Sequence, residues 1–302
     1  MEYVSSYRAL WETGELKERE KAAWERLRCC SLCGHECGVD RLSGETGICE
    51  ADDTVLISSW GPHFGEEPPL VGRCGSGTVF FTGCNLKCVF CQNWDISQMG
   101  MGRQISTDEL GKIMASLQKA GCHNINLVTP THCVPQILAA LIAACDKGLS
   151  IPLVYNCGGY ESVETLKILD GIVDIYMPDV KYARREHALR YSGAKDYPKV
   201  AKAALREMHR QVGDLVIDKN GIARRGLLVR HLVLPGGLAG TAEIMEFIAK
   251  EISQDTYINI MAQYRPEYRA REYPPLNRRI TSHEYREAIE IARNQGLHRL
   301  AR

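Results

Sequence analysis

The 302-residue sequence has no net charge, no long apolar run and no apolar stretch among its first twenty residues. The 37 Lys and Arg residues match 37 Asp and Glu residues, so no overall field favours nucleic acid as a partner. The longest apolar candidate, residues 137–145, is far below the ~20 residues that a membrane-spanning helix needs. A secretory signal would show an apolar core near the start. We therefore expect a soluble, cytoplasmic protein that has no membrane partner.

Cysteine is what the sequence has in excess. Its 13 cysteines are an odd number, and without a secretory signal a disulfide framework is not expected. Metal binding or catalysis explains them better, because nine of the 13 fall within the first 91 residues. The other four lie in apolar segments, where cysteine acts as a small buried hydrophobe. These four are Cys122, Cys133, Cys145 and Cys157.

Six apolar strand patterns alternate with helix patterns over the last three quarters of the chain. This alternation predicts parallel strands joined by crossover helices, in an open sheet or an incomplete barrel. Either architecture places a ligand site at the C-terminal ends of the strands. The predicted strands are 78–82, 124–128, 151–155, 172–177, 227–234 and 257–261. The predicted helices are 107–117, 135–145, 162–169, 183–191, 199–212, 241–252 and 282–294. An Asn-Gly turn signal within 216–222 predicts a hairpin before the fifth strand.

The first part of the chain has a different character. It begins with a helix pattern over 8–28, continues with a Cys- and Gly-rich stretch, and then shows a strand at 55–60. We predict an N-terminal part over 1–76 and a core over 77–302. His63, Glu66 and Glu67 lie in the Gly/Pro-rich connection at 61–77, which is either a substrate loop or a solvated surface loop.

The most specific motif follows the first core strand. Cys84, Cys88 and Cys91 have the spacing C-x3-C-x2-C within TVFFTGCNLKCVFCQNWDIS. Three thiolates on one loop would leave one iron of a cubane cluster open to a small ligand. The alternative is a zinc site completed by a distant Cys or His.

A second group of cysteines precedes that motif. Cys30, Cys33, Cys37 and Cys49 give four thiols interleaved with glycines. Four cysteines form a closed site, which favours structural zinc, although the triplet spacing also suits an auxiliary iron–sulfur cluster. Cys29 and Cys74 are alternative ligands.

The Cys84–Cys91 segment resembles the signature of the radical S-adenosylmethionine (SAM) superfamily, and Phe90 before the last cysteine fits that pattern. The following Cys-Gln-Asn is similar to the activating enzymes of glycyl radical enzymes, particularly the pyruvate formate-lyase-activating type. The phrases GEEPPL, RGLLVRHLVLPGG and NIMAQYRP extend this resemblance to a group of activating-enzyme homologues over nearly the whole chain.

The resemblance implies an incomplete (β/α)6 TIM-like barrel and an oxidoreductase that uses a [4Fe–4S] cluster and SAM. One electron would cleave SAM, and the resulting 5′-deoxyadenosyl radical would take a hydrogen atom from the substrate. The implied partners are an electron donor such as flavodoxin or ferredoxin and a glycyl radical enzyme. Two other functions stay open: modification of a small molecule, peptide or RNA, and a non-catalytic zinc or iron–sulfur protein.

The resemblance also suggests SAM contacts at two strand ends. Thr129 and Thr131 stand where the family has a Gly-Gly-Glu-like stretch that receives the SAM amino group; the other interpretation is helix capping. Asn156 follows the third strand and corresponds to the ribose-contact region, or it caps a tight turn.

Later strand ends supply the remaining candidates. Asp179 and Lys181 resemble the Asp-x-Lys element of activating enzymes, which binds substrate or SAM. Arg230 lies within an apolar strand, where a charge needs a partner; that partner would be the SAM carboxylate or a buried acid. His231 points to the opposite face. Gln263, with Tyr264 and Arg265, is a candidate for the adenine or substrate region.

Overall fold

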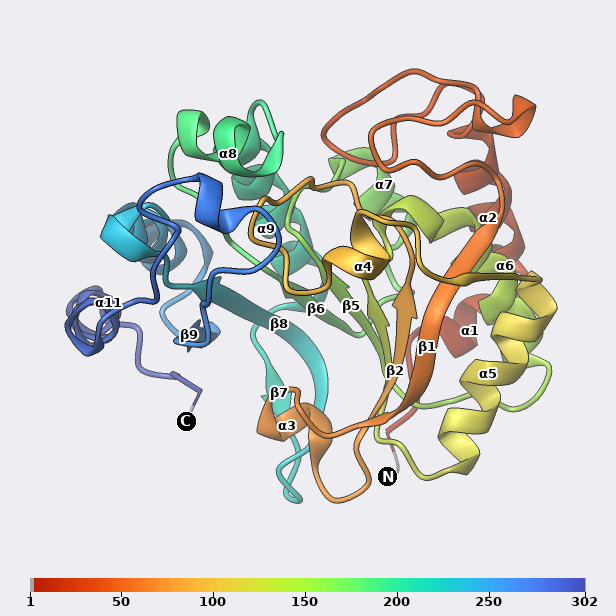
Figure 1. Cartoon of the computed structure of the whole chain (residues 1–302). Helices are drawn as coiled ribbons and strands as arrows, with labels where there is room; N and C mark the ends of the chain where they lie inside the picture. The colour runs from red at the N-terminus through yellow and green to blue at the C-terminus, as the bar shows by residue number, and fades with distance from the viewer. Residues whose placement is uncertain (1–2, 302) are drawn as a thin grey trace.

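The computed structural model describes residues 3–301, so residues 1 and 302 of the predicted bounds lie outside the described part. Six strands run parallel in the order β2, β4, β5, β6, β8, β9 (Figure 1). This confirms the predicted α/β fold with a mostly parallel sheet. The strands are β2 (Ser76–Phe81), β4 (Ile125–Val128), β5 (Leu153–Cys157), β6 (Ile175–Pro178), β8 (Ala223–Leu232) and β9 (Tyr257–Met261).

Three further strands extend this parallel set. β1 (Val55–His63) pairs antiparallel with β2, and β3 (Arg103–Ile105) pairs antiparallel with β1 at the sheet edge. β1 is longer than the strand predicted at 55–60, and β3 was not predicted because three residues carry too little pattern. β7 (Val216–Ile217) forms the predicted hairpin with β8.

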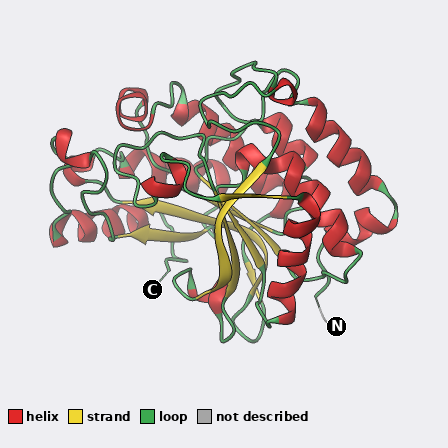
Figure 2. Ribbon diagram, turned by 45° about the vertical axis from the view of Figure 1, so that its right-hand side comes forward, coloured by secondary structure: helices red, strands yellow, loops and turns green. Residues whose placement is uncertain are grey.

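Helices pack around the outer side of the twisted sheet (Figure 2). Two begin at clear capping signals: Ser106 accepts a hydrogen bond from the Glu109 amide, and Thr281 and Glu284 form a capping box. The helices beyond β1 are α3 (Pro68–Val71), α4 (Trp94–Ser97), α5 (Thr107–Lys119), α6 (Val134–Cys145), α7 (Val163–Ile168), α8 (Arg185–Ser192), α9 (Tyr197–Val212), α10 (Thr241–Phe247) and α11 (Ser282–Asn294). Short turns are η2 (Thr131–Cys133), η3 (Pro235–Gly237), the π-helical η4 (Ile248–Ile252) and η5 (Ala270–Glu272).

The single helix predicted over 8–28 is wrong. The structure has α1 (Tyr7–Glu12) and α2 (Glu15–Glu25), which are separated at Gly14. Gly14 adopts a left-handed backbone with φ of 81°, which ends one helix and lets the chain turn into the next. The predicted helix over 241–252 is also divided, because it passes from α10 into η4.

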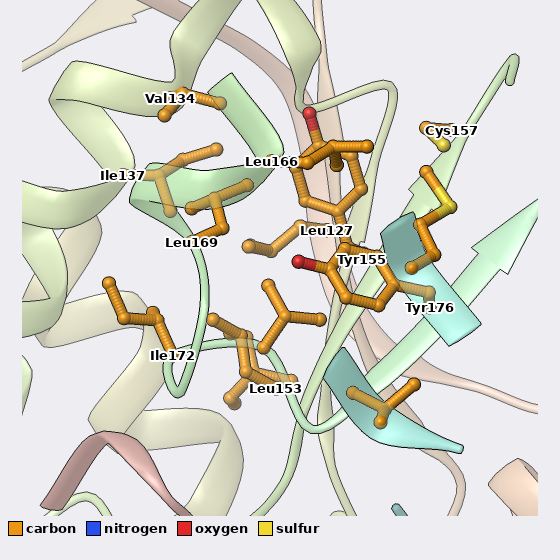
Figure 3. Close-up of a cluster of buried hydrophobic side chains, with 14 of the residues drawn as sticks. Leu127, Val134, Ile137, Leu153, Tyr155, Cys157, Leu166, Leu169, Ile172 and Tyr176 are labelled. Carbon is orange, nitrogen blue, oxygen red and sulfur yellow. The ribbon is translucent and has the colours of Figure 1, made fainter. Parts of the chain in front are cut away.

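The main core lies between the outer face of the sheet and the helices. Leu127 and Tyr155 on neighbouring strands contact the layer that contains Ile137 of α6 and Leu166 of α7 (Figure 3). A second buried cluster, rich in tyrosine, surrounds the loop after β2 and includes Phe90. Within residues 3–301, no helix has the length and apolarity that crossing a membrane requires.

The Cys-rich segment between α2 and β1 has little regular structure. It holds the short turn η1 (Arg41–Ser43) and otherwise consists of loops. In Figure 1 these red-to-orange loops and α4 lie beyond the end of the sheet toward which β2 points. The segment therefore lies at the same end of the sheet as the loop that carries Cys84.

Candidate active site

A cavity of about 270 Å³ lies at the C-terminal ends of the parallel strands. β4 contributes Val128, β5 contributes Asn156, and the loop after β6 contributes Asp179. The loop after β2 closes another side with its three cysteines. This is the position expected for a ligand site in a parallel α/β sheet.

Each thiol of the Cys84, Cys88 and Cys91 triad has a polar neighbour that can stabilise a thiolate. The Leu86 amide donates to Cys84 Sγ at 3.3 Å, and Ser192 Oγ donates to Cys88 Sγ at 2.9 Å. Ser97 Oγ lies 3.1 Å from Cys91 Sγ. Hydrogen bonds to sulfur are among the features that tune iron–sulfur clusters.

Two backbone hydrogen bonds to the end of α8 hold the loop that carries the cysteine triad. The amides of Lys87 and Val89 donate to the carbonyl oxygens of Ser192 and Tyr191 at 3.0 and 2.9 Å.

Burial raises the pKa of Cys88 to about 11, although the attraction of the thiolate to the Lys181 ammonium opposes this rise. A bound metal would deprotonate these thiols, because thiolate is the form that binds metal.

Phe90 supports the same loop as an aromatic wall of the cavity. Its ring lies edge-on to Tyr264 at 5.8 Å and to Tyr182 at 6.4 Å. Phe90 is buried and lines the cavity beside the cysteines. The aromatic residue before Cys91 therefore packs the loop against Tyr182 and Tyr264.

A network of charges forms the opposite side of the cavity. Asp179 accepts hydrogen bonds from Arg230 Nε at 2.8 Å and from Lys181 Nζ at 2.5 Å. Arg230 also donates to Asn156 Oδ1 at 2.7 Å and lies 3.6 Å from the Glu66 carboxylate. In this structure Arg230 therefore pairs with two partly buried acids of the chain, Asp179 and Glu66.

The balance of charge sets the protonation of this network. Burial raises the pKa of Asp179, but the attraction to Arg230 and Lys181 exceeds that effect and lowers it to about 2. Burial lowers the pKa of Lys181, and the nearby Asp179 carboxylate reverses this, so the ammonium keeps its proton. All three side chains are therefore charged at neutral pH.

The other predicted SAM contacts divide into two groups. Thr129 lines the cavity and has an unusual φ of 60°, and its amide donates to the Asn156 carbonyl at 2.8 Å. Gln263 also lines the cavity, and its carbonyl accepts from Gln92 Nε2 at 3.2 Å. Thr131 is not among the residues that line the cavity. Its hydroxyl donates instead to Glu161 at 2.9 Å.

The structure also resolves two orientation questions. His231 lies on the other face of β8 from Arg230 and contacts the Val180 carbonyl and Thr241. Asn156 is the fourth residue of β5 rather than the residue after it, because β5 ends at Cys157, two residues later than predicted. Glu66, from the connection that precedes β2, reaches Arg230.

The four N-terminal cysteines meet at a separate small cavity. Cys30, Cys33, Cys37 and Cys49 line it together with Arg41, His35 and His132. Within residues 3–301, no group of three or more His, Cys, Asp or Glu side chains is arranged to bind a single metal ion. In a cubane cluster each cysteine binds a different iron, so this finding concerns mononuclear sites and leaves the fit of a cluster open.

Several functional neighbours were not identified from the sequence. Ser192 contacts Cys88 across 104 positions. His132 joins the N-terminal cysteines from outside their motif, and Arg41 joins them from between Cys37 and Cys49. A serine or arginine in a polar segment carries no spacing signal. The one available signal was the position of His132 directly after Thr131, at the end of a predicted strand.

The protein has a mostly parallel α/β sheet, and three cysteines line a cavity at the C-terminal ends of its strands. In α/β proteins of this class, the ligand site lies at that edge of the sheet. Residues 78–218 match the family model of the radical SAM superfamily, so this part of the chain is a radical SAM domain. It is 36% identical over 278 residues to MJ0674, an uncharacterised protein of Methanocaldococcus jannaschii, with 89% of this chain and 75% of the relative covered. MJ0808 of the same organism, also uncharacterised, is 25% identical over 291 residues, or 89% and 77% of the two chains.

A solved structure shares the fold. A radical SAM methyltransferase from Sphaerobacter thermophilus superposes with a TM-score of 0.52 and 15% identity, over 73% of this chain and 64% of that one. A radical SAM domain implies a [4Fe–4S] cluster and SAM. The three cysteines fit such a cluster, because each has a polar neighbour at its sulfur and all three face one cavity.

Proposed function

We propose that this protein cleaves SAM reductively in the cavity at the C-terminal edge of the sheet and uses the product to abstract a hydrogen atom. The observation that carries this proposal is the convergence of three hydrogen-bonded thiols, Cys84, Cys88 and Cys91, on one cavity with fixed charges opposite. A bound [4Fe–4S] cluster would supply the electron for the cleavage.

The residues of the chain would bind and orient SAM. SAM carries an amine and a carboxylate on one carbon, and Asp179 and Lys181 offer the complementary charges at the cavity wall. Asn156 and Thr129 present polar groups on the neighbouring strand ends. Phe90 excludes water from the cysteine side. Arg230 holds Asp179 in place, and any SAM carboxylate would compete with that acid for the guanidinium.

For the substrate, we infer a glycine of a partner protein, as in a glycyl-radical activase. Two features support this choice. Gln92 and Asn93 after the last cysteine line the cavity, as do Asp179 and Lys181 of the Asp-x-Lys element. In addition, Trp94 and Tyr268 stack at 5.5 Å and are both exposed, which offers an aromatic surface beside these residues.

Formation of 5′-deoxyadenosine tests the SAM-cleavage proposal. Anaerobic protein reconstituted with iron and sulfide is incubated with SAM and dithionite, and the product is quantified by mass spectrometry. We expect turnover by the wild type and none by Cys88→Ala. Cys74→Ala is the matched control, because Cys74 is exposed and lines neither cysteine cavity. Equal product from Cys88→Ala and wild type would refute the site.

Electron paramagnetic resonance tests the activase proposal separately. The reconstituted protein, SAM and reductant are mixed with a candidate glycyl radical enzyme. A protein-based doublet that requires all three components is expected. Abundant 5′-deoxyadenosine with no protein radical would contradict the activase role. Mass spectrometry of small molecules, peptides and RNA would then identify the modified substrate.

A further inference from the structure

The Cys-rich segment has little hydrophobic support of its own. Its buried apolar cluster consists of Leu27, Cys30 and Leu32, with three partly buried neighbours. Two residues other than glycine, Glu36 and Glu50, have φ of 43° and 59°, and such left-handed conformations cost of order 1–3 kcal/mol each. A segment with so small a hydrophobic core needs another stabilising interaction, such as a disulfide or a bound metal.

Four free thiols from this segment face one cavity. Cys30, Cys33, Cys37 and Cys49 all line it, and none forms a disulfide. The thiol of Cys33 is close enough to those of Cys30 and Cys49 to interact electrostatically, and Cys37 interacts with the same two. A Cβ atom at Gly47 would lie 2.6 Å from Cys37 Sγ. Glycine at this position therefore lets the backbone approach the sulfur.

Burial raises the pKa of the Cys33 and Cys37 thiols. The backbone amides of His35, at Cys33, and of Val39, at Cys37, oppose that rise. Both follow the same pattern, from residue i+2 to sulfur i, as the Leu86 amide and Cys84. Such donors favour the thiolate over the thiol. The N-terminal loops thus share a thiolate-stabilising turn with the superfamily's cluster motif.

A buried cation with an unused donor lines the same cavity. Arg41 is 0% exposed, and both of its side-chain hydrogen bonds go to the Asp52 carbonyl oxygen. Its Nη1 atom is buried without a partner. A buried guanidinium is costly unless a negative charge is near. The Asp52 carboxylate is near enough to Arg41 to interact with it electrostatically. A metal held by four thiolates would place a further net negative charge beside the guanidinium.

His132 gives a second unused polar atom at this cavity. Its Nε2 donates to the Thr82 carbonyl at 2.8 Å, and its Nδ1 is buried without a partner. His132 lines the cavity although it lies 83 residues or more beyond the four cysteines. A polar atom that is fully buried and unpaired there is an independent indication of a ligand.

We propose that Cys30, Cys33, Cys37 and Cys49 bind a metal centre through four thiolates, with Arg41 offsetting its negative charge. This goes beyond the proposed function and does not depend on it. The centre is either an iron–sulfur cluster or a zinc ion, since both take four thiolates and leave a net negative charge. A zinc ion would draw the four sulfurs toward one point, whereas a cluster would bind them at separate irons.

The centre would also support the catalytic loop. His35 contacts the Asn85 carbonyl at 2.8 Å and His132 contacts that of Thr82 at 2.8 Å. A Cβ atom at Gly83 would lie 3.0 Å from the Cys49 carbonyl oxygen. These contacts fall on both sides of Cys84. Ordering the N-terminal loops therefore positions the loop that begins the cysteine triad.

Metal analysis of a protein without the triad tests this proposal. The full-length Cys84→Ala/Cys88→Ala/Cys91→Ala variant is purified anaerobically, and iron, sulfide and zinc are measured before and after reconstitution. We expect retained metal: iron with sulfide identifies a cluster, and zinc alone identifies a mononuclear site. A metal-free protein under every condition would overturn the proposal.

Ligand identity is tested on the same background. Adding Cys33→Ser and Cys37→Ser should remove the metal, whereas Cys29→Ser, at an exposed neighbour outside the cavity, should not. X-ray absorption at the metal edge of the triad variant needs no further substitution and should show a ligand shell dominated by sulfur. A shell made mainly of nitrogen or oxygen, or equal metal loss in Cys29→Ser, would overturn the assignment.

Discussion

The two cysteine groups of this chain use the same side chain in opposite environments. Cys84, Cys88 and Cys91 supply three thiols at a cavity of about 270 Å³ whose far wall carries Asp179 paired with two cations. The N-terminal group supplies four thiols around a small cavity beside Arg41, whose Nη1 atom is buried without a partner. The two groups therefore differ in the number of thiols and in the charge beside them.

The two groups also differ in what supports them. The catalytic loop packs into a cluster of buried tyrosines that includes Tyr182 and Tyr197. The N-terminal loops have only the small cluster around Leu27 and Leu32. Loss of a ligand should therefore affect mainly activity in the first group and mainly stability in the second. The predictions below concern the surroundings of the two groups and the contact between them, beginning with the largest expected effect.

Asp179→Asn should be the most damaging change at the catalytic group. The substitution keeps the shape but leaves Lys181 without its buried counterion and removes the main partner of Arg230. Breaking a buried pair from one side costs about 3–5 kcal/mol. Anaerobic guanidinium unfolding should show this loss, in addition to weaker SAM binding.

The control for this change is Asp108→Asn. Asp108 pairs with Lys112 on the surface of α5, where both side chains are more than half exposed. Exposed pairs contribute about 0–1 kcal/mol. Equal effects of the two substitutions would mean that the charges around Asp179 stabilise the fold no more than a surface pair does.

Glu161 lies between the two groups and predicts a pH dependence. Its backbone bridges to Cys33, and its carboxyl accepts from Thr131 and Tyr155 at 2.9 Å. Burial raises its pKa from 4.5 to about 7, although these hydrogen bonds oppose the shift. The native state therefore holds a proton that the unfolded chain releases, so this contribution is present below pH 4.5 and is lost as the pH rises through about 7. The loss amounts to about 3 kcal/mol.

Glu161→Gln should remove that pH dependence, because an amide stays neutral and can still accept from Thr131. Unfolding free energies are measured from about pH 4.5 to pH 8 for the variant and the wild type, so that shared pH effects cancel. Glu164→Gln, on the exposed side of α7, is the control. Parallel pH profiles for Glu161→Gln and wild type would contradict the raised pKa.

Local spacing explains what was predictable from the sequence and what was not. The cysteine triad and the strands were found because their signals lie within a few residues. The pairing of Asp179 with Arg230 spans 51 positions and depends on the register of β6 against β8. Periodicity gives the face of a strand but not its register. The position of Arg41 beside the N-terminal cysteines could not be predicted, because a buried arginine has the same local sequence context as an exposed one.

The smallest predicted effect tests the contact between the two groups. His35 lies beside Cys33, donates to the Asn85 carbonyl at 2.8 Å and packs edge-on against Tyr160 at 4.9 Å. His35→Ala removes one hydrogen bond between the N-terminal loops and the catalytic loop, which should cost about 1 kcal/mol and lower Tm by a few degrees, roughly 2–4 °C for a chain of this size. His283→Ala is the control, since His283 is 81% exposed on α11.

If the two groups are mechanically linked, His35→Ala should also lower the iron content at the triad after mild chelation, whereas His283→Ala should not. Unchanged iron retention in His35→Ala would show that the catalytic loop is held by its tyrosine cluster alone.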